Sequence, residues 1–139
     1  MVLFSALYGA PQAIENSASA LPAVQEVTSS TNVEDYTRSY FKDTPILAEV
    51  AKCESKFTQL DKNGKVVRGR INRADVGVMQ INEYYHLDQS KKIGMDIYTL
   101  EGNLAYGKLI YDKYGTKPWS ASEKCWGKYA VKTPELAKK

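Results

Sequence analysis

The stretch Asp43–Phe57, DTPILAEVAKCESKF, has the pattern of an amphipathic helix that begins near its proline. Asp43 or Thr44 can cap this helix, and Pro45 suits the first helical position, where its missing N–H costs nothing. Four residues recur at helical spacing and predict one buried face: Leu47, Val50, Ala51 and Glu54.

Glu54 is the charged member of that predicted face. An isolated glutamate on a helix is most often a solvated surface residue. On a buried face, however, the loss of water disfavours the ionised carboxylate and raises its pKa toward that of a usable general acid. The pattern therefore makes Glu54 a candidate catalytic acid.

A small hairpin or three-stranded sheet is predicted in the segment 60–72, LDKNGKVVRGRIN. Its Asn63-Gly64 pair is a strong tight-turn signal, and three strand formers follow: Val66, Val67 and Ile71. Asp61–Gly64 holds only a fragment of a calcium loop, without the later ligands or the closing glutamate. We therefore expect no metal site.

The remaining pattern is mostly helical. From Val76 onward the chain is expected to turn helical again, with a short helix in 88–94 and a longer one in 99–115, which has a threonine cap and a final glycine. The segment 120–130 predicts a last helix. These elements indicate an α+β fold, mostly helical, with no internal repeat.

The ends of the chain differ from this body. Residues 1–20 have an apolar run and a small-residue cleavage site, Ala18–Ala20, but they lack the positively charged segment with which a signal peptide begins. They are interpreted as a signal peptide truncated at its start, or as a disordered leader. Residues 21–44 are expected to form a linker, 45–130 the folded domain, and 131–139 a basic tail. No apolar run approaches the roughly 20 residues of a membrane-spanning helix, so no integral membrane segment is expected.

The charge is unevenly distributed. Residues 1–45 hold two basic and five acidic residues, whereas residues 46–139 hold 17 basic and 11 acidic ones, a net charge of +6. Such a body favours a polyanionic partner, either nucleic acid or an anionic envelope. The segment 65–73, KVVRGRINR, carries no recognised nucleic-acid motif, so we expect no nucleic-acid partner.

The two cysteines, Cys53 and Cys125, lie 72 residues apart. This spacing excludes a local metal site or a CxxC redox motif. In an exported protein we expect a disulfide that ties the ends of the domain together. In a cytoplasmic protein the two would be buried thiols.

Four pieces in a fixed order carry a family resemblance: ESKF on a helix, a hairpin, ADVGVMQIN, and DIYTLEGNLAYG. Together they resemble the lysozyme-like superfamily, most closely the soluble lytic transglycosylase domains, over about residues 46–126. The resemblance implies a lysozyme-like fold with Glu54 as catalytic acid. It also implies that Met79 packs by the active-site helix, that Gln80 points into a substrate groove, and that Asn103, Leu104 and Gly107 form a second signature.

The stretch ADVGVMQIN also resembles c-type lysozymes. That resemblance implies Asp75 as a second catalytic carboxylate and Asn82 as a group that holds an N-acetyl substituent. The alternative for Asp75 is a turn or helix-cap residue. The choice between a transglycosylase and a hydrolase stays open here.

The same resemblance places further residues in the substrate groove. The amides of Gln80 and Asn82 are expected to face N-acetyl groups. Tyr84 and Tyr85 stand where lysozymes carry groove aromatics, although core or surface packing explains them equally well. His86 is expected at a solvated loop position.

One segment departs from the family. Residues 117–126, KPWSASEKCW, stand where transglycosylases carry a tyrosine that contacts the catalytic glutamate. Trp119, Ser120 or Tyr106 is expected to take over that contact, and Trp119 and Tyr106 are also expected to bind substrate. A Cys53–Cys125 bond would then fix the helix of the acid against the segment that carries Trp119.

The resemblance implies an enzyme that needs no cofactor and cleaves the β-1,4 bond between N-acetylmuramic acid and N-acetylglucosamine. Its partners are peptidoglycan strands and an envelope or secretion apparatus. The expected protein is a monomer, secreted or held in the periplasm or cell envelope. A glycan-binding or scaffold module without turnover is the alternative from another class.

Overall fold

The computed structural model describes residues 30–130, so the signal-peptide and basic-tail predictions lie outside the described residues. The described chain is mostly helical with one two-stranded antiparallel sheet, which confirms the α+β class. No helix in this part is both long and apolar enough to span a bilayer.

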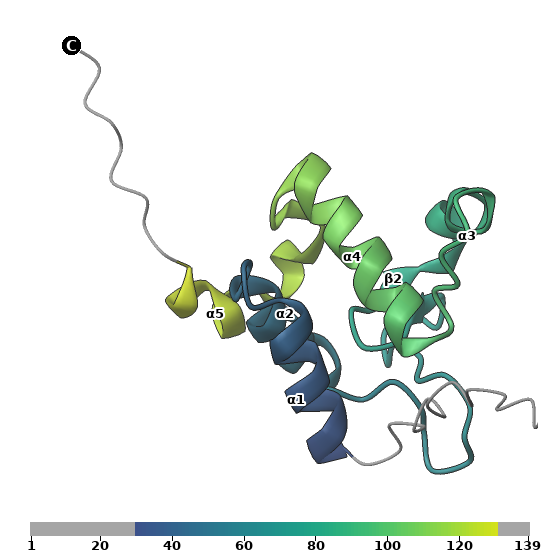
Figure 1. Ribbon diagram of the computed structural model, residues 1–139, viewed down its shortest axis with the longest axis horizontal. Coiled ribbons are helices and arrows are strands. Elements are labelled where there is room, and N and C mark those ends of the chain that lie inside the picture. The colour runs from purple at the N-terminus through teal and green to yellow at the C-terminus, as the bar shows by residue number, and fades with distance from the viewer. Residues whose placement is uncertain (1–29, 131–139) are drawn as a thin grey trace, which may run out of the picture.

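The first helix, α1 (Ser30–Tyr40), lies where the sequence predicted a linker, and that prediction is wrong for residues 30–44. α1 lies beside α2 (Figure 1) and buries Val33, while Phe41 directly after it is also buried. Arg38 joins the two helices, since its Nη1 lies 2.8 Å from Glu49 Oε1. The linker prediction failed because the apolar stripe is narrow: most of α1 is polar.

The helix of the opening stretch is α2 (Ile46–Ser55). It buries the predicted apolar face, including Leu47, Val50 and Ala51. Neither Asp43 nor Thr44 caps it; Pro45 occupies the cap position. The helix ends because the next two residues, Lys56 and Phe57, take left-handed φ angles of 54° and 58°.

The sheet is not where the strand formers predicted it. β1 (Asp75–Val76) pairs with β2 (Ile81–Asn82), and the chain between them is a tight turn rather than the expected helix. The Asn63-Gly64 turn forms, but Leu60 and Val66 make only an isolated bridge. Ile71 is fully exposed at 103%. The segment 60–72 is too polar to cover a core with a sheet of its own.

The later helices follow the sequence pattern closely. α3 (Glu83–Lys92) overlaps the short helix predicted in 88–94 but begins five residues earlier and ends two residues earlier. α4 (Leu100–Tyr114) is capped by Thr99, whose Oγ1 accepts a hydrogen bond from the Gly102 N–H. The predicted last helix is broken into three short pieces, η1 (Lys117–Ser122), α5 (Glu123–Trp126) and η2 (Gly127–Tyr129).

A disulfide joins Cys53 of α2 to Cys125 of α5, with the Cα atoms 6.0 Å apart. This pairing confirms the predicted disulfide. α5 packs against α2 at this point, on the side of α2 away from α3 (Figure 1). The disulfide therefore closes the domain by linking its second helix to its last one.

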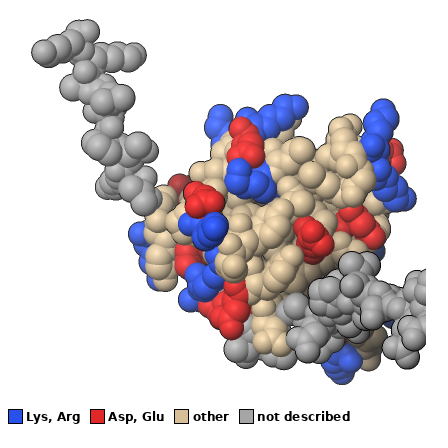
Figure 2. Space-filling view, in the orientation of Figure 1, with Lys and Arg blue, Asp and Glu red and all other residues tan. Residues whose placement is uncertain are grey.

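Charged side chains of both signs are interspersed over the face of the molecule seen in Figure 2. The basic excess of residues 46–139 is thus not gathered into one patch on that face. Long-range attraction depends on net charge, whereas tight polyanion binding needs a contiguous basic site.

Candidate active site

A cavity of about 280 Å³ opens where α2, the β1–β2 hairpin, α3, α4 and η1 meet. Its lining combines two carboxylates with amide, imidazole, indole and apolar groups. The residues are Glu54, Asp75, Gln80, Ile81, Asn82, His86, Ile110, Pro118, Trp119 and Ala121. Of the predicted site residues, the structure brings together Glu54, Asp75, Gln80, Asn82 and Trp119.

Glu54 lies in the last turn of α2 and is half-buried. Burial raises the pKa of its carboxyl above the ordinary value; a hydrogen bond from Ser122 opposes this rise, and the negative charge of Asp75 adds to it. The predicted placement of a carboxyl group with a raised pKa is therefore confirmed. Such a group retains its proton to a higher pH than a solvated glutamate does.

The neighbours of Glu54 in sequence hold the end of α2 in place. Cys53, directly before it, is tied to α5 by the disulfide. Ser55, directly after it, donates from Oγ to the carbonyl oxygen of Val78 at 2.8 Å. Glu54 is thus fixed on one side by a covalent bond and on the other by a hydrogen bond to the hairpin turn.

The turn of the hairpin, residues 77–80, is held by side chains from three other segments. The Val78 N–H donates to Gln59 Oε1 at 2.9 Å, and the Met79 N–H donates to Asn103 Oδ1 at 2.8 Å. The indole N–H of Trp119 donates to the Met79 carbonyl oxygen at 2.9 Å. Buried backbone groups are costly when unpaired, so these bonds specify the path of the turn.

Two glycines permit this packing. Gly77 has a φ of 74°, and a Cβ at that position would collide with the amide of Asn103 and lie 2.8 Å from Gln59 Oε1. A Cβ on Gly107 would lie 3.0 Å from Met79 Cγ. These two glycines therefore allow α4 and the hairpin turn to approach each other.

Asp75 and Asn82 face each other across the β1–β2 pair. Asn82 Nδ2 donates to Asp75 Oδ1 at 2.8 Å, and Asn82 Oδ1 caps α3 by accepting from the Tyr84 N–H at 3.1 Å. The helix-cap alternative for Asp75 is wrong because residues 77–80 form a turn and not a helix, so there is no helix for Asp75 to cap. Asp75 is a strand residue whose carboxylate borders the same cavity as Glu54.

Gln80 lines the cavity from a strained backbone position, with a φ of 51°. Its Nε2 donates to the Gly77 carbonyl oxygen at 2.9 Å, which orients the carboxamide. Left-handed conformations of residues other than glycine cluster at functional sites, where the surrounding structure compensates for the strain. Here the hydrogen bonds that anchor the turn provide that compensation.

Two predicted groove residues do not line the cavity. Tyr85 is 82% exposed on the outside of α3, as is Tyr84. Tyr106 is buried, and its hydroxyl oxygen lies 3.2 Å from Nδ1 of His86. Tyr85 and Tyr106, both expected to bind substrate, thus lie outside the cavity lining: the first is exposed on α3, and the hydroxyl of the second meets His86.

His86 borders the cavity instead, which contradicts the expected solvated loop position. Burial lowers the pKa of its imidazole. The sequence contained a signal for this position. His86 follows the cap residue Asn82 by four positions, and residues four apart lie on one face of a helix, so a helix that presents Asn82 to the cavity presents His86 to it as well.

Ser122 is the second residue that the sequence did not reveal. Its Oγ donates to Glu54 Oε1 at 2.6 Å, whereas no hydrogen bond within residues 30–130 joins Glu54 to Trp119, Ser120 or Tyr106. The available signal was the disulfide: Ser122 precedes Cys125 by three residues, and Glu54 follows Cys53 directly. The pairing of the two cysteines brings their neighbours together.

A larger hollow of about 580 Å³ lies at the other end of α2, lined by Pro45, Tyr111 and Tyr129 among others. Its half-buried acid, Glu49, is held by Arg38 at 2.8 Å. None of the residues in the four pieces that carry the family resemblance lines this hollow, so the candidate site is the cavity that contains Glu54. Within residues 30–130, no group of three or more His, Cys, Asp or Glu side chains could hold a metal ion.

No family model, curated protein or solved structure matches this chain. The chemistry of the cavity follows from its own residues. A carboxyl group with a raised pKa borders an open hollow together with a second carboxylate and two carboxamides. This arrangement can donate a proton to a polar ligand that is held by hydrogen bonds.

Proposed function

We propose that the protein is a lytic transglycosylase that cleaves the β-1,4 bond between N-acetylmuramic acid and N-acetylglucosamine in peptidoglycan. The observation that carries the proposal is the half-buried carboxyl of Glu54, with its raised pKa, in a cavity bordered by Gln80, Asn82 and Trp119. Cleaving a glycosidic bond requires a neutral acid beside the leaving-group oxygen.

In the first step the carboxyl of Glu54 transfers its proton to the bridging oxygen, and the bond from that oxygen to the muramyl C1 breaks. The Glu54 carboxylate then takes the proton of the muramyl C6 hydroxyl, whose oxygen bonds to C1. The products are a shortened glycan and a 1,6-anhydro-muramyl end. No water is consumed, and Glu54 ends the cycle protonated.

A muramidase is the second candidate, and Asp75 is the observation that favours it. Asp75 borders the same cavity, and its negative charge contributes to the raised pKa of Glu54. In that mechanism Glu54 is the acid while Asp75 stabilises the positive centre or forms a bond to C1, and water completes hydrolysis. Lysozymes are the type case of two carboxyl groups that take separate roles because their surroundings differ.

The rest of the cavity suits a polar sugar chain. The carboxamides of Gln80 and Asn82 can exchange hydrogen bonds with N-acetyl groups, while Trp119, only 4% exposed, forms part of the cavity wall. The disulfide is compatible with an exported protein that works in the cell envelope. The proposal therefore includes a monomeric, secreted or periplasmic enzyme, active beside an envelope or secretion apparatus.

Digestion of purified peptidoglycan, followed by chromatography and mass spectrometry of the muropeptides, tests the proposal. Anhydro-muramyl products support the transglycosylase, and reducing muramic acid ends support the muramidase. The full chain with Glu54→Gln serves as the inactive control. Glycan binding without either product over a long incubation would instead assign the protein to the non-catalytic modules.

A further inference from the structure

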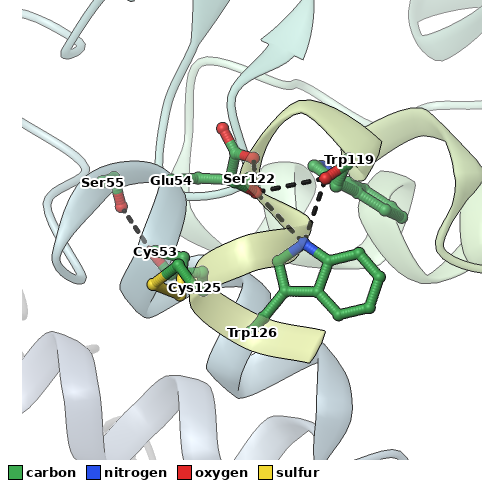
Figure 3. The surroundings of a disulfide bond; sticks show 8 residues. Cys53, Glu54, Ser55, Trp119, Ser122, Cys125 and Trp126 are labelled. Carbon is green, nitrogen blue, oxygen red and sulfur yellow. Dashed lines mark hydrogen bonds between the residues drawn. A yellow bond between two sulfur atoms is a disulfide. The ribbon is translucent and has the colours of Figure 1, made fainter. Parts of the chain in front are cut away.

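The hydroxyl of Ser122 lies within hydrogen-bond distance of three groups. Its Oγ is 2.6 Å from Glu54 Oε1, 3.1 Å from the Trp119 carbonyl oxygen and 3.1 Å from Trp126 Nε1. Figure 3 shows these contacts on the short helical segment that the disulfide ties to α2. The number of groups matters because a hydroxyl has only one proton to donate.

The chemistry of the three groups determines the direction of each bond. The single indole N–H of Trp126 can only donate, and it is shared between a lone pair of Ser122 Oγ at 3.1 Å and the Trp119 carbonyl oxygen at 3.0 Å. The serine proton must then go either to Glu54 Oε1 or to the Trp119 carbonyl. Glu54 Oε1 is the nearer acceptor in either protonation state, and once the carboxyl group is ionised the bond becomes charge-assisted and therefore stronger. The Trp119 carbonyl already accepts from Trp126 Nε1 at 3.0 Å.

We propose that Ser122, oriented by Trp126, is a positioning residue that makes Glu54 Oε1 the protein-bound oxygen and leaves Oε2 to carry the transferable proton. Figure 3 shows one carboxylate oxygen beside Ser122 and the other directed away from it. Among residues 30–130 no hydrogen bond engages Oε2, while the carboxyl group borders the cavity. The transferable proton thus lies on the oxygen that is free to meet a ligand.

The position of Ser122 depends on the two helices that the disulfide joins. Cys125 lies one helical turn beyond Ser122, and Cys53 is the residue before Glu54. Trp126 is buried in the core at 4% exposure, so its indole N–H is a fixed donor. Donor, hydroxyl and carboxylate therefore form one chain of hydrogen bonds with both ends anchored.

Other charges near Glu54 must be distinguished from this chain. The titratable groups that share its cavity are Asp75 on β1 and His86 on α3, and η1 contributes none to the lining. Asp75 raises the pKa of Glu54, whereas the Ser122 hydrogen bond lowers it. Removing the Ser122 hydroxyl should therefore raise that pKa further.

The first test uses the unmodified protein and nuclear magnetic resonance. The chain has two tryptophans, so its indole N–H groups give two signals. The Trp126 signal should move with pH at the midpoint of the Glu54 carboxyl titration, because its acceptor Ser122 is bonded to that carboxyl. The Trp119 N–H, which donates to Met79, serves as the internal control and should move much less.

The Glu54→Gln variant distinguishes the titration of Glu54 from those of other groups in this measurement. Its Trp126 signal should no longer titrate. A Trp126 signal that is insensitive to pH in the unmodified protein would overturn the inference. The same signal titrating equally in Glu54→Gln would also overturn it, because Asp75 or His86 would then be the cause.

The second test replaces the hydroxyl. Ser122→Ala should shift the ¹³C-detected carboxyl titration of Glu54 to higher pH and lower kcat about tenfold with little change in KM, as loss of a hydrogen bond to a charged group predicts. Ser122→Thr keeps the hydroxyl and should restore both values. Ser120→Ala, on the same segment and exposed, is the matched control.

The catalytic use of the Glu54 proton rests on the proposed function, whereas the hydrogen bond between Ser122 and Glu54 does not depend on it. If the unmodified protein cleaves no glycan while Trp126 still titrates with Glu54, the proposed function fails and Ser122 remains the partner of the acid. If Ser122→Ala leaves the Glu54 titration unchanged in an active enzyme, the positioning role is wrong and the function stands.

Discussion

Cys125 is bonded to Cys53, the residue directly before the candidate acid Glu54. The same segment supplies Ser122, whose hydroxyl donates to Glu54. One covalent link thus stabilises the domain and places a hydrogen-bond donor at the site. Stability and chemistry are therefore coupled in this corner of the fold (Figure 3).

Replacing both cysteines by serine separates these two effects. We expect Cys53→Ser/Cys125→Ser to lose about 2–4 kcal/mol of unfolding free energy, because the unfolded chain is no longer cross-linked. Urea denaturation measures this loss, and the unmodified protein with reductant should match it. A double variant as stable as the oxidised protein would show that packing of α5 on α2 suffices.

Glu54→Gln should lower cleavage by roughly 100- to 10,000-fold, the usual contribution of a general acid. It should also change the pH dependence of stability. Since the folded-state pKa of Glu54 is raised, its favourable contribution is present below the unfolded-state pKa and is lost as pH rises through the folded value. Glutamine does not titrate, so the variant should be the more stable protein at neutral pH, with the advantage vanishing in acid.

Asp75→Asn distinguishes the two candidate enzymes. The asparagine oxygen can still accept from Asn82, so the hairpin should persist. Removing the negative charge should lower the pKa of Glu54 and move the alkaline limb of kcat/KM to lower pH. A transglycosylase should keep its anhydro products, whereas a muramidase should lose hydrolysis. Asp88→Asn, on the exposed side of α3, is the control.

Gly77→Ala tests the packing of the hairpin turn, and Gly94→Ala is its matched control. Both glycines have a φ near 75°, at 74° and 75°, but only Gly77 is crowded, by Asn103 and Gln59. We expect Gly94→Ala to cost about 1–2 kcal/mol for the left-handed backbone alone. Gly77→Ala should cost about 1–3 kcal/mol more for the collision. Equal losses in thermal or urea denaturation would mean that the turn can move aside.

Local pattern was sufficient for several elements of the fold. The stretch around Leu47 and Val50 is helical because its apolar residues share one face, and α4 begins at Thr99 because threonine is a good cap. The buried placement of Glu54 followed from the same periodicity. The missed helix α1 shows the limit of this approach, because Val33 and Phe41 are too few to stand out in a polar segment.

The sheet was misplaced for a different reason. Strand propensity favoured Val66, Val67 and Ile71, but the paired strands are the two-residue pieces around Asp75 and Asn82. These pieces are ordered by buried partners: Gln59 and Asn103 accept hydrogen bonds from the turn between them. Propensity describes an isolated strand, and it does not register partners that come from distant segments.

The position of Glu54 on α2 could be predicted from the sequence because helical periodicity is a property of neighbouring residues. The cysteine count and the charge distribution are likewise properties of the sequence alone. The surroundings of the acid could not be predicted in this way. Ser122 reaches Glu54 because the disulfide joins their segments, and His86 reaches the cavity because the capped start of α3 places it there. Hydrogen bonds between residues 68 positions apart, such as Ser122 and Glu54, depend on packing that no local pattern encodes.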